Sequence, residues 1–526
     1  MKPILTGEDL IDAGYSEGPM IGKMLARAAK HEANGVSDKK YLLKLLKREF
    51  AAPPPKMVMR EKPASLTEAI EPTGKEEKEN VAKVRKKMDE LLKVPVIHRG
   101  AIMPDACPAG AAPAVIPVGG AIAVENAIIP SAHSADICCS MFATFYEARS
   151  EVKNEINALA TATRFGPGGR HFDDLVHHPV LEEEVWENRF LTGLKERARI
   201  HIADQGDGNH FAYVGEVELT LAQLAKLHSA GHSDFARRLQ GGAELGELGE
   251  SAEAPKKYRV LVTHHGSRGL GAHLYKRGQI AAEKQTNKIA DRIPKAAVWL
   301  DAKSDDGRAY WDALQYVARW TKANHEAIHA RFLERIGGEA VAQFGNEHNF
   351  VWKRGDTFFH GKGATPAWKD AEGRPLLGLI PLNMAEPILM VLGNDNEEFL
   401  SFAPHGAGRN LSRTALKRLY PGDESKKRAI EAGTRGIDVR WFCGEPDLSE
   451  TPVAYKNADQ VKAQIAQFGL ADLVTEIQPL GCIMAGESGV PFWKKRKEEE
   501  LTPKQKRQLQ HRAERRRNKQ DLGKEW

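Results

Sequence analysis

The chain has 526 residues, of which 41% are hydrophobic and 28% are charged, and this composition excludes a disordered or fibrous protein. Its five cysteines have no regular spacing and exclude a disulfide scaffold, and the length allows roughly two to four domains. The polar start MKPILTGEDL is unlike a signal peptide, and prolines and glycines interrupt the most apolar stretch. We therefore expect a cytoplasmic protein that does not enter a membrane.

The formal net charge of +5 is unevenly distributed along the chain. Residues 494–519 contain 12 Lys and Arg against 4 Glu, a local charge of +8, so the remainder carries 5 − 8 = −3. A basic segment attached to a slightly acidic body favours contact with a polyanion. The alternative is a solvated tail without a partner.

Residues 1–50 are predicted to form a small helical module. The segments MIGKMLARAAKHEA and KKYLLKLLKREF place apolar residues three and four apart, with Lys and Arg on the opposite face. Thr6 is expected to cap the first helix, and Gly18 and Pro19 to begin the next one. The sequence AAPPP then ends the helical pattern, because proline cannot continue a helix.

Three further regions follow this module. Residues 51–93 form a linker whose second half, Lys75 to Lys93, has the charge pattern of a surface helix. Residues 94–490 mix glycine-rich loops and β-branched runs such as RVLVTHH with helical intervals such as Tyr310 to Ile336. Residues 491–526 are a polar, basic tail. This order predicts an α+β fold with a sheet-rich domain between the module and the tail.

The stretch PSAHSADICCSM contains the first residues that could bind a metal. Asp136 and Cys139 stand three apart and could direct a carboxylate and a thiolate at one point, and a thiolate can bridge two cations. We expect the neighbouring Cys138 to be buried packing, as free cysteine often is.

Several histidines lie in glycine-rich or strand-end contexts and could complete one or two divalent-metal sites. They are His210, His264, His348, His360 and His405. A lone histidine of this kind is more often a hydrogen-bonded structural residue than a ligand. Mixed carboxylate, thiolate and imidazole ligands suit Mn²⁺, Zn²⁺ or Fe²⁺, and the ligand types do not choose among them.

The sequence HGAGR, which begins at His405, predicts an anion-binding loop. Its glycines let backbone N–H groups approach a phosphate closely, and Arg409 offers a guanidinium fork. A histidine at the head of such a loop could attack a phosphate as a nitrogen nucleophile, and the alternative is a glycine-rich turn with a solvent-facing histidine. HHGSRGLG is a second loop of this kind, with Arg268 as its fork, and it matches neither a Walker loop nor a dinucleotide fingerprint.

Together these motifs resemble the RtcB-type RNA ligases, the tRNA-splicing ligases that join RNA 3′-phosphate or 2′,3′-cyclic phosphate ends to 5′-hydroxyl ends. The resemblance extends from about Val94 to Gly486. It is carried, in chain order, by AIMPDACPAG, AIIPSAHSADICCSM, GDGNHF, HHGSRGLG, ANHEAI, EHNF, HGKGAT, IPLNM, HGAGRNLSR, TPVAYK and IQPLG. So many motifs in one order make the resemblance highly specific.

The resemblance implies a role for each matching position. Two Mn²⁺ ions would be bound, and the Cys139 thiolate would bridge them. Their ligands would be Asp136, Cys139, His210, His264 and His348. GTP would be the co-substrate, His405 the nucleophile that takes GMP from it, and Asp105 a further residue of the site. The residues implied to hold the nucleotide are Asn209, Asn349, Pro381, Leu382, Asn383, Met384, Gly406, Ala407, Gly408 and Arg409. RNA would be the partner, with an activating protein as a possible second one.

The chain departs from the family pattern at positions implied to contact the nucleotide or the substrate. Tyr213 stands where an acidic residue usually contacts guanine, and Met484 where a lysine usually contacts the nucleotide. Asn383 and Ile388 replace two serines, and the histidine that usually follows MPDV is absent from MPDACP. The positions of the metal ligands and of the nucleophile are intact. We therefore interpret the chain as a divergent member that keeps the nucleotidyl-histidine, while the preferred nucleotide stays open.

The first 50 residues resemble a different family. The segment ILTGEDLIDAGYSEGPMIGKMLARA is similar to the helical C-terminal module of CCA-adding enzymes and poly(A) polymerases, which belongs to their tRNA-binding half. This resemblance implies that a basic helix around Lys39 to Arg48 would contact phosphates without reading sequence. The alternative is a generic helix-turn-helix start.

Three functions compete on the sequence alone. The first is a metal-dependent RNA ligase, or a nucleotidyltransferase that caps RNA 3′ ends without joining them. The second is a binuclear phosphoesterase that uses the same ligands and a metal-bound hydroxide. The third is an RNA-binding protein whose altered nucleotide site no longer turns over.

Overall fold

The computed structural model describes most of the chain between residues 3 and 486. The described ranges are 3–15, 18–50, 56–166, 168–241, 256–411, 413–442 and 446–486. The predicted basic tail lies outside them. No helix within these ranges is long and apolar enough to cross a membrane.

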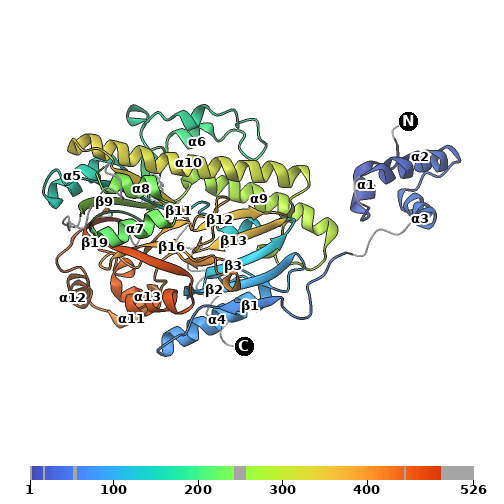
Figure 1. The fold of residues 1–526 in the computed structure, drawn as a ribbon. Coiled ribbons are helices and arrows are strands. Elements are labelled where there is room, and N and C mark those ends of the chain that lie inside the picture. Colours follow the sequence, from blue (N-terminus) through green and yellow to red (C-terminus); the bar gives the residue numbers. More distant parts are fainter. Residues whose placement is uncertain are drawn as a thin grey trace, which may run out of the picture.

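Residues 3–50 form three helices, as the apolar spacing predicts. They are α1 (Gly7–Asp12), α2 (Pro19–Ala33) and α3 (Lys39–Glu49) (Figure 1). The Thr6 side chain caps α1 in a reciprocal capping box with Asp9, and Gly18 and Pro19 begin α2. The helices bury an apolar cluster of their own, which includes Leu10, Met24, Leu42 and Leu46.

The largest sheet of the body has eight strands and carries most of the candidate site. Seven strands follow the order β11-β5-β9-β8-β19-β16-β15, and β18 pairs with β19 at one side. Their bounds are β5 (Ser140–Tyr146), β8 (Gly208–Leu219), β9 (Lys256–His265), β11 (Ala342–Glu347), β15 (Leu377–Pro381), β16 (Ile388–Gly393), β18 (Asp438–Trp441) and β19 (Ala471–Gly486). Neighbours in the order are antiparallel, so this part of the sheet is built of hairpins and longer antiparallel returns.

An asparagine side chain joins the two outer strands of that order. The Leu379 N–H of β15 donates to Oδ1 of Asn346 at 2.8 Å, and Nδ2 of Asn346, in β11, donates to the Leu379 carbonyl at 3.4 Å. The amide thus takes the place of a backbone ladder between β11 and β15. Because His348 follows β11 and Pro381 ends β15, this closure brings two sides of the site together.

A second, five-stranded sheet has the order β1-β2-β3-β13-β12. Its strands are β1 (Ser65–Glu68), β2 (Ile97–Cys107), β3 (Val118–Glu125), β12 (Asn349–Arg354) and β13 (Thr357–Lys362). Three small two-stranded sheets pair β4 (Ala127–Ile128) with β10 (Leu300–Asp301), β6 (Arg164–Phe165) with β7 (Asp204–Gly206), and β14 (Ala364–Pro366) with β17 (Phe402–Pro404). The turn between β11 and β12, at His348, connects the two large sheets.

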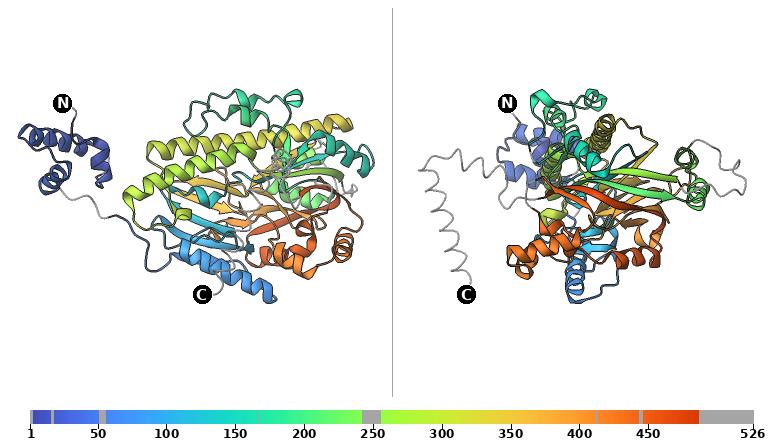
Figure 2. Two further views of the ribbon diagram at one scale, coloured as in Figure 1. Left: turned by 180° about the vertical axis from the view of Figure 1, so that it is seen from behind. Right: turned by 90° about the vertical axis from the view of Figure 1, so that its left-hand side faces the viewer.

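Two long helices cover one face of the sheets. α9 (Arg268–Ile289) and α10 (Asp305–Ile336) lie side by side along the body in both Figure 1 and Figure 2. Buried Tyr316, Trp320 and Ile328 fix α10 to the main core. On the opposite side α4 (Lys75–Leu91), predicted from its charge pattern, packs Val84 and Met88 against β2. The remaining helices are α5 (Val152–Ala162), α6 (Lys195–Arg199), α7 (Leu221–Ser229), α8 (Ser233–Leu239), α11 (Arg413–Leu419), α12 (Asp423–Gly433) and α13 (Ala458–Gln467).

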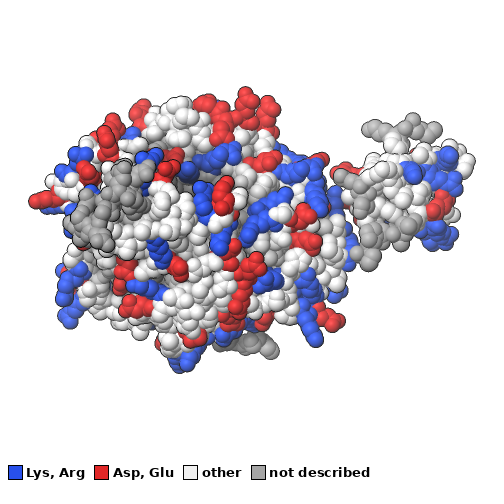
Figure 3. Space-filling view, viewed as in Figure 1, with Lys and Arg blue, Asp and Glu red and all other residues white. Residues whose placement is uncertain are grey.

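The predicted α+β architecture is therefore confirmed. Acidic and basic side chains are interspersed over the face of the body seen in Figure 3, without a continuous field of one sign. This agrees with the small negative charge that remains for the body when the basic tail is excluded.

Candidate active site

The five metal-ligand candidates converge because their strands are neighbours. Cys139 directly precedes β5, and β5 pairs with β9 so that Met141 lies opposite His264. The next pairing, of β9 with β8, places Phe211 opposite His264 and so brings in His210. The His348 N–H donates to the Cys139 carbonyl at 2.9 Å. Residues far apart in the sequence thereby meet at one end of the sheet.

The side chains form two ligand groups that share one sulfur. Cys139 Sγ lies 3.1 Å from His264 Nε2, which lies 3.2 Å from His348 Nε2. Cys139 Sγ also lies 3.8 Å from His210 Nε2, which lies 3.1 Å from Asp136 Oδ2. In each group the ligand atoms lie within 4.8 Å of one another, so each group is compact enough to hold a metal ion.

The protonation of the cluster suits metal ligation. Burial lowers the pKa of His264 to about 3 and the pKa of His348 well below 6.5, so both imidazoles are neutral near pH 7. Nδ1 of His264 faces the Asn209 carbonyl at 3.3 Å, and donation there leaves the Nε2 lone pair directed at Cys139. Burial opposes ionisation of Asp136, but His210 and Arg268 hold its pKa below the usual range.

The Cys139 thiol is the group that a bound cation would change most. Burial, and then the Asp136 carboxylate, raise its pKa well above 9. Without a cation the sulfur keeps its proton, and a cation would displace that proton to form the thiolate. The neutral imidazoles, the carboxylate and the displaceable thiol proton together fit divalent metals such as Mn²⁺ or Zn²⁺.

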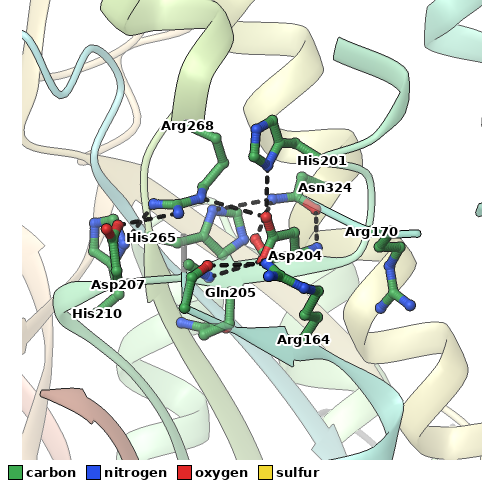
Figure 4. Close-up of polar contacts among 12 residues, drawn as sticks. Arg164, Arg170, His201, Asp204, Gln205, Asp207, His210, His265, Arg268 and Asn324 are labelled. Carbon is green, nitrogen blue, oxygen red and sulfur yellow. Dashed lines mark hydrogen bonds and ion pairs between the residues drawn. The ribbon is translucent and has the colours of Figure 1, made fainter. Parts of the chain in front are cut away.

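Arg268 contacts Nδ1 of His210, the ring nitrogen that is not the candidate ligand atom. Arg268 is not the phosphate fork that the sequence predicts. Its Nη1 lies 3.3 Å from His210 Nδ1, and its other nitrogens face Asp207 at 3.1 Å and Asp204 at 3.8 Å. Figure 4 shows the guanidinium between Asp204 on one side and Asp207 and His210 on the other. Only 7% of the side chain is exposed, and its nitrogens face these three residues.

Asp204 is the buried centre of this supporting network. In addition to Arg268, it contacts His201 Nδ1 at 2.6 Å and Arg164 at 3.7 Å (Figure 4). The only local signal for this role in the sequence is the pair of aspartates that precedes the histidine in DQGDGNH. A buried carboxylate is costly unless several cations compensate it, which explains the surrounding positive groups.

His405 stands beside the metal-ligand cluster and is held by a buried carboxylate. Its ring centroid lies 4.8 Å from that of His348. Asp105 Oδ2 lies 2.5 Å from His405 Nδ1 and accepts the His405 backbone N–H at 3.2 Å. Asp105 is fully buried, and a Cβ atom at Gly408 would collide with its carbonyl, so the HGAG loop needs glycine there. Nε2 of His405 is then the ring nitrogen that can act as a nucleophile.

A cavity of about 180 Å³ opens next to His405, and it is called the His405 cavity below. Most nucleotide-binding candidates line it, namely Asn209, Pro381, Leu382, Asn383, Met384, Gly406, Ala407, Gly408 and Arg409. Asn349 does not, because its Oδ1 accepts the Gly363 N–H at 2.8 Å and thereby holds the loop before β14. The cavity is lined in addition by residues that the sequence analysis did not propose as binding groups, among them Cys107, Phe211, Glu450, Tyr455 and Cys482.

Arg409 lies in the cavity wall but is already paired. Its guanidinium contacts the buried Glu450 carboxylate and lies over the Tyr455 ring at 5.5 Å. The Tyr455 hydroxyl donates to the same carboxylate at 3.0 Å. A phosphate bound at the HGAG loop would therefore meet a guanidinium whose charge is largely balanced.

Two other candidates have structural roles. His360 accepts the Ile129 N–H at Nε2 (3.0 Å) and faces the Phe358 carbonyl with Nδ1 (3.3 Å), so both ring nitrogens are engaged away from the cluster. Cys138 is fully buried in the main core, as predicted.

The fold and the site together define an α+β protein with a buried thiol, imidazole and carboxylate cluster, beside a histidine that borders a cavity. The RtcB family, described as tRNA-splicing ligase RtcB, matches residues 180–485, which is more than half of the chain. The chain belongs to this family.

Curated relatives agree with this membership. The chain is 27% identical to "tRNA-splicing ligase RtcB" of Pyrococcus abyssi over 320 residues, which cover 55% of this chain and 32% of that protein. It is 27% identical to the protein of the same name from Thermococcus kodakarensis, over 55% of this chain and 60% of the relative. The protein of that name from Methanocaldococcus jannaschii is also 27% identical, over 55% of this chain and 30% of the relative. The match thus spans between about a third and 60% of the length of these relatives.

Proposed function

We propose that the protein is a metal-dependent RNA ligase that works through a nucleotidyl-histidine. The observation that carries the proposal is the position of His405. Its ring packs near His348 of the ligand cluster, its Nδ1 is held by buried Asp105, and it borders the His405 cavity. A phosphoesterase that uses a metal-bound hydroxide would need the cluster but not an oriented second histidine beside a cavity.

Two divalent ions, Mn²⁺ in our proposal, would be held by the two ligand groups, and Cys139 belongs to both of them. Cys139, His264 and His348 would hold one ion, and Asp136, Cys139 and His210 the other. When bound, the ions supply positive charge that neutralises phosphate oxygens during in-line transfer. Arg268 would orient His210, and Asn209 would orient His264 through its carbonyl.

In the first step, Nε2 of His405 attacks the α-phosphorus of a nucleoside triphosphate. An N–P bond forms, the bond from that phosphorus to the bridging β-oxygen breaks, and pyrophosphate leaves. The Nδ1–H donates to Asp105 throughout, which keeps the ring in position and stabilises the positive charge that develops on it. Backbone N–H groups of the HGAG loop would contact the phosphates.

In the second step, an oxygen of an RNA 3′-phosphate attacks the phosphorus of the nucleotidyl-histidine and frees His405. In the third, a 5′-hydroxyl attacks the activated 3′-phosphate, a new phosphodiester forms, and the nucleoside monophosphate leaves. The order is physically reasonable because a 3′-phosphate is a poor electrophile until it carries a good leaving group. The RNA substrate would be tRNA-like or have broken ends, in the cytoplasm.

The experiment incubates the protein with α-³²P-labelled nucleoside triphosphates and Mn²⁺, then denatures it and counts protein-bound label. We expect label that is stable to alkali and labile to acid, as a phosphoramidate is, and that is absent from His405→Ala. His360→Ala is a matched control, because both of its ring nitrogens are engaged in a structural role.

Other outcomes distinguish the competing functions. Phosphate release from cyclic-phosphate RNA without labelled protein would favour the phosphoesterase. Labelled protein that transfers its nucleotide to a 3′-phosphate without joining a 5′-hydroxyl would favour an RNA-capping activity. Tight RNA binding without either reaction would indicate a non-catalytic RNA-binding protein.

A further inference from the structure

The His405 cavity extends along one pair of strands, away from the metal-ligand cluster. Alternate residues of β8, Asn209, Phe211 and Tyr213, face it, as expected for residues on one side of a strand. On β19, Met484 lies opposite Phe211 and Cys482 lies opposite Tyr213. Tyr213 is four steps along the strand from Asn209, a distance of roughly 13 Å. The cavity therefore has a near end at Asn209 and His405, and a far end at Tyr213 and Cys482.

Hydrogen-bond donors at the far end are already engaged. The Tyr213 hydroxyl donates to the Ile477 carbonyl at 3.0 Å, and the Tyr213 side chain is almost fully buried. The Cys482 thiol points to the Met484 sulfur at 3.5 Å. Neither of these two donors is therefore directed into the cavity.

The loop before β16 adds a single polar side chain. Oδ1 of Asn383 accepts the backbone N–H groups of Ala385 and Glu386 at 3.0 and 3.1 Å. Towards a ligand the side chain therefore offers its amide nitrogen, which can only donate. Every nucleobase presents acceptor atoms, so a donor alone does not distinguish one base from another.

We infer that the His405 cavity takes purine nucleoside triphosphates and discriminates little between adenine and guanine. The inference rests on the proposed nucleotidylation of His405. The base would be held by apolar and sulfur contacts with Phe211, Tyr213 and Met484, and not by recognition of its hydrogen-bonding edge. Methionine is flexible and polarisable, and it is common at surfaces that accept several ligands. At about 180 Å³ the cavity is slightly larger than the roughly 150 Å³ that accommodates benzene, so it is large enough to enclose the base.

The expected selectivity follows from the kind of contact. A site that hydrogen-bonds a ligand group rejects an analogue without that group by about 10⁴- to 10⁵-fold, whereas an apolar pocket discriminates by only about 10- to 200-fold. We therefore expect ATP and GTP to label the protein at rates within about tenfold of each other. CTP and UTP should label it more slowly, because a smaller ring buries less apolar surface.

The test compares initial rates of Mn²⁺-dependent labelling of the full-length protein by the four α-³²P nucleoside triphosphates. Rates for ATP and GTP within tenfold support the inference. A preference above about a thousandfold for either purine overturns it, since apolar contacts alone do not supply such selectivity.

A second measurement separates this inference from the proposed function. Equilibrium dissociation constants for ATP and GTP are measured with His405→Asn, which cannot form the covalent adduct. If the wild type takes no label but this variant binds both purines with similar affinity, the proposed reaction fails and the inference stands. If the variant binds neither purine nucleotide, the inference fails.

Variants at Tyr213 test the far end directly. Tyr213→Phe should keep the ratio of ATP to GTP labelling, because the hydroxyl it removes is already bonded to Ile477. A change of that ratio above tenfold would contradict the engaged hydroxyl. Tyr213→Glu should favour GTP by about a hundredfold or more, since a carboxylate accepts both N–H donors of the guanine edge that adenine lacks. Tyr316→Phe is the control for losing a buried tyrosine hydroxyl, as Tyr316 donates to the Val180 carbonyl, remote from the cavity.

Discussion

Cys139 provides the ligand atom that the two groups of the candidate metal centre share. A thiolate is a much better ligand for borderline metals than a serine hydroxyl, and here it would contribute to both ion positions. Loss of the Cys139 thiolate should therefore weaken the binding of two ions, whereas loss of any other ligand should weaken the binding of one.

We predict that Cys139→Ser lowers the Mn²⁺ or Co²⁺ content of the purified protein from about two ions per chain to fewer than one. Metal analysis after equilibration and desalting measures this. Cys138→Ala is the matched control, because Cys138 is a buried neighbour that belongs to neither ligand group. Unchanged metal content in Cys139→Ser, with loss in Cys138→Ala, would contradict a shared sulfur.

Single residues were predictable from the sequence where their role is local to a motif. Asp136, Cys139 and His405 were proposed from residue type and spacing, and the structure brings them together. Arg268 was wrongly predicted as a phosphate fork, because its partner Asp204 stands 64 residues earlier and no local pattern connects the two. Glu450, which pairs with Arg409, was missed for the same reason.

At the scale of elements, the Asn346 amide determines how the large sheet closes. Its side chain is buried and makes two hydrogen bonds to the backbone of Leu379 in β15. Alanine would leave a buried N–H and a buried C=O without partners, which typically costs about 1–3 kcal/mol per group. The same change would loosen the connection between His348 and the IPLNM loop.

We predict that Asn346→Ala lowers the free energy of unfolding by about 3 kcal/mol and also slows His405 labelling. Chemical denaturation followed by tryptophan fluorescence gives the first quantity, and the label assay the second. Asn34→Ala, at an exposed helix end, should change neither. Wild-type stability in Asn346→Ala would show that another contact closes the sheet.

The exposed face of α3 is the second feature at this scale. Lys40, Lys44, Lys47 and Arg48 lie within about a third of the helix circumference, opposite buried Leu42 and Leu46, with exposed Tyr41 at the edge. These four cations form no ion pair with any residue in the described ranges, whereas Lys39 on the same helix contacts Asp9 at 2.6 Å. Basic side chains are visible on this module in Figure 3. A stripe of this kind suits the phosphates of RNA.

We predict that Lys44→Gln/Lys47→Gln weakens binding of single-stranded RNA and lowers the slope of log affinity against log salt by about 1.4, or about 0.7 per lost contact. Fluorescence anisotropy at several salt concentrations measures the slope. Lys39→Gln, which removes a cation that is already paired, should change it less. A change of slope in Lys39→Gln that is half of the change in the double variant would contradict a defined stripe and indicate a general response to net charge.

Elements were more predictable than their arrangement. Apolar spacing located α2, α3 and α10 and the charge pattern located α4, because periodicity is a local property of the sequence. The order of the strands could not be read in the same way. The pairing of β8 with β19 joins residues more than 260 positions apart, and that pairing forms the long wall of the His405 cavity.

At the scale of the whole molecule, the body buries several histidines that belong to neither of the two metal-ligand groups. Burial lowers the pKa of His133 to about 4, and the pKa values of His329 and His360 to about 3, from 6.5. Each ring is engaged in hydrogen bonds within the core and stays neutral in the folded state. In the unfolded chain each would take up a proton below pH 6.5.

The sign of the pH dependence follows from these lowered values. Between about pH 6.5 and pH 4 the unfolded state binds more protons than the folded state, so stability is complete above pH 6.5 and falls as the pH falls. Each such histidine contributes about 1.4 kcal/mol per pH unit across that window.

We predict a marked loss of stability between pH 7 and pH 5.5, measured by denaturant unfolding of protein freed of metal with a chelator. His360→Gln should reduce the slope of stability against pH by about 1.4 kcal/mol per pH unit, the contribution of one proton. Glutamine can accept the Ile129 N–H but does not titrate. A stability that is constant or rises on acidification would mean that these imidazoles are accessible to protons in the folded protein.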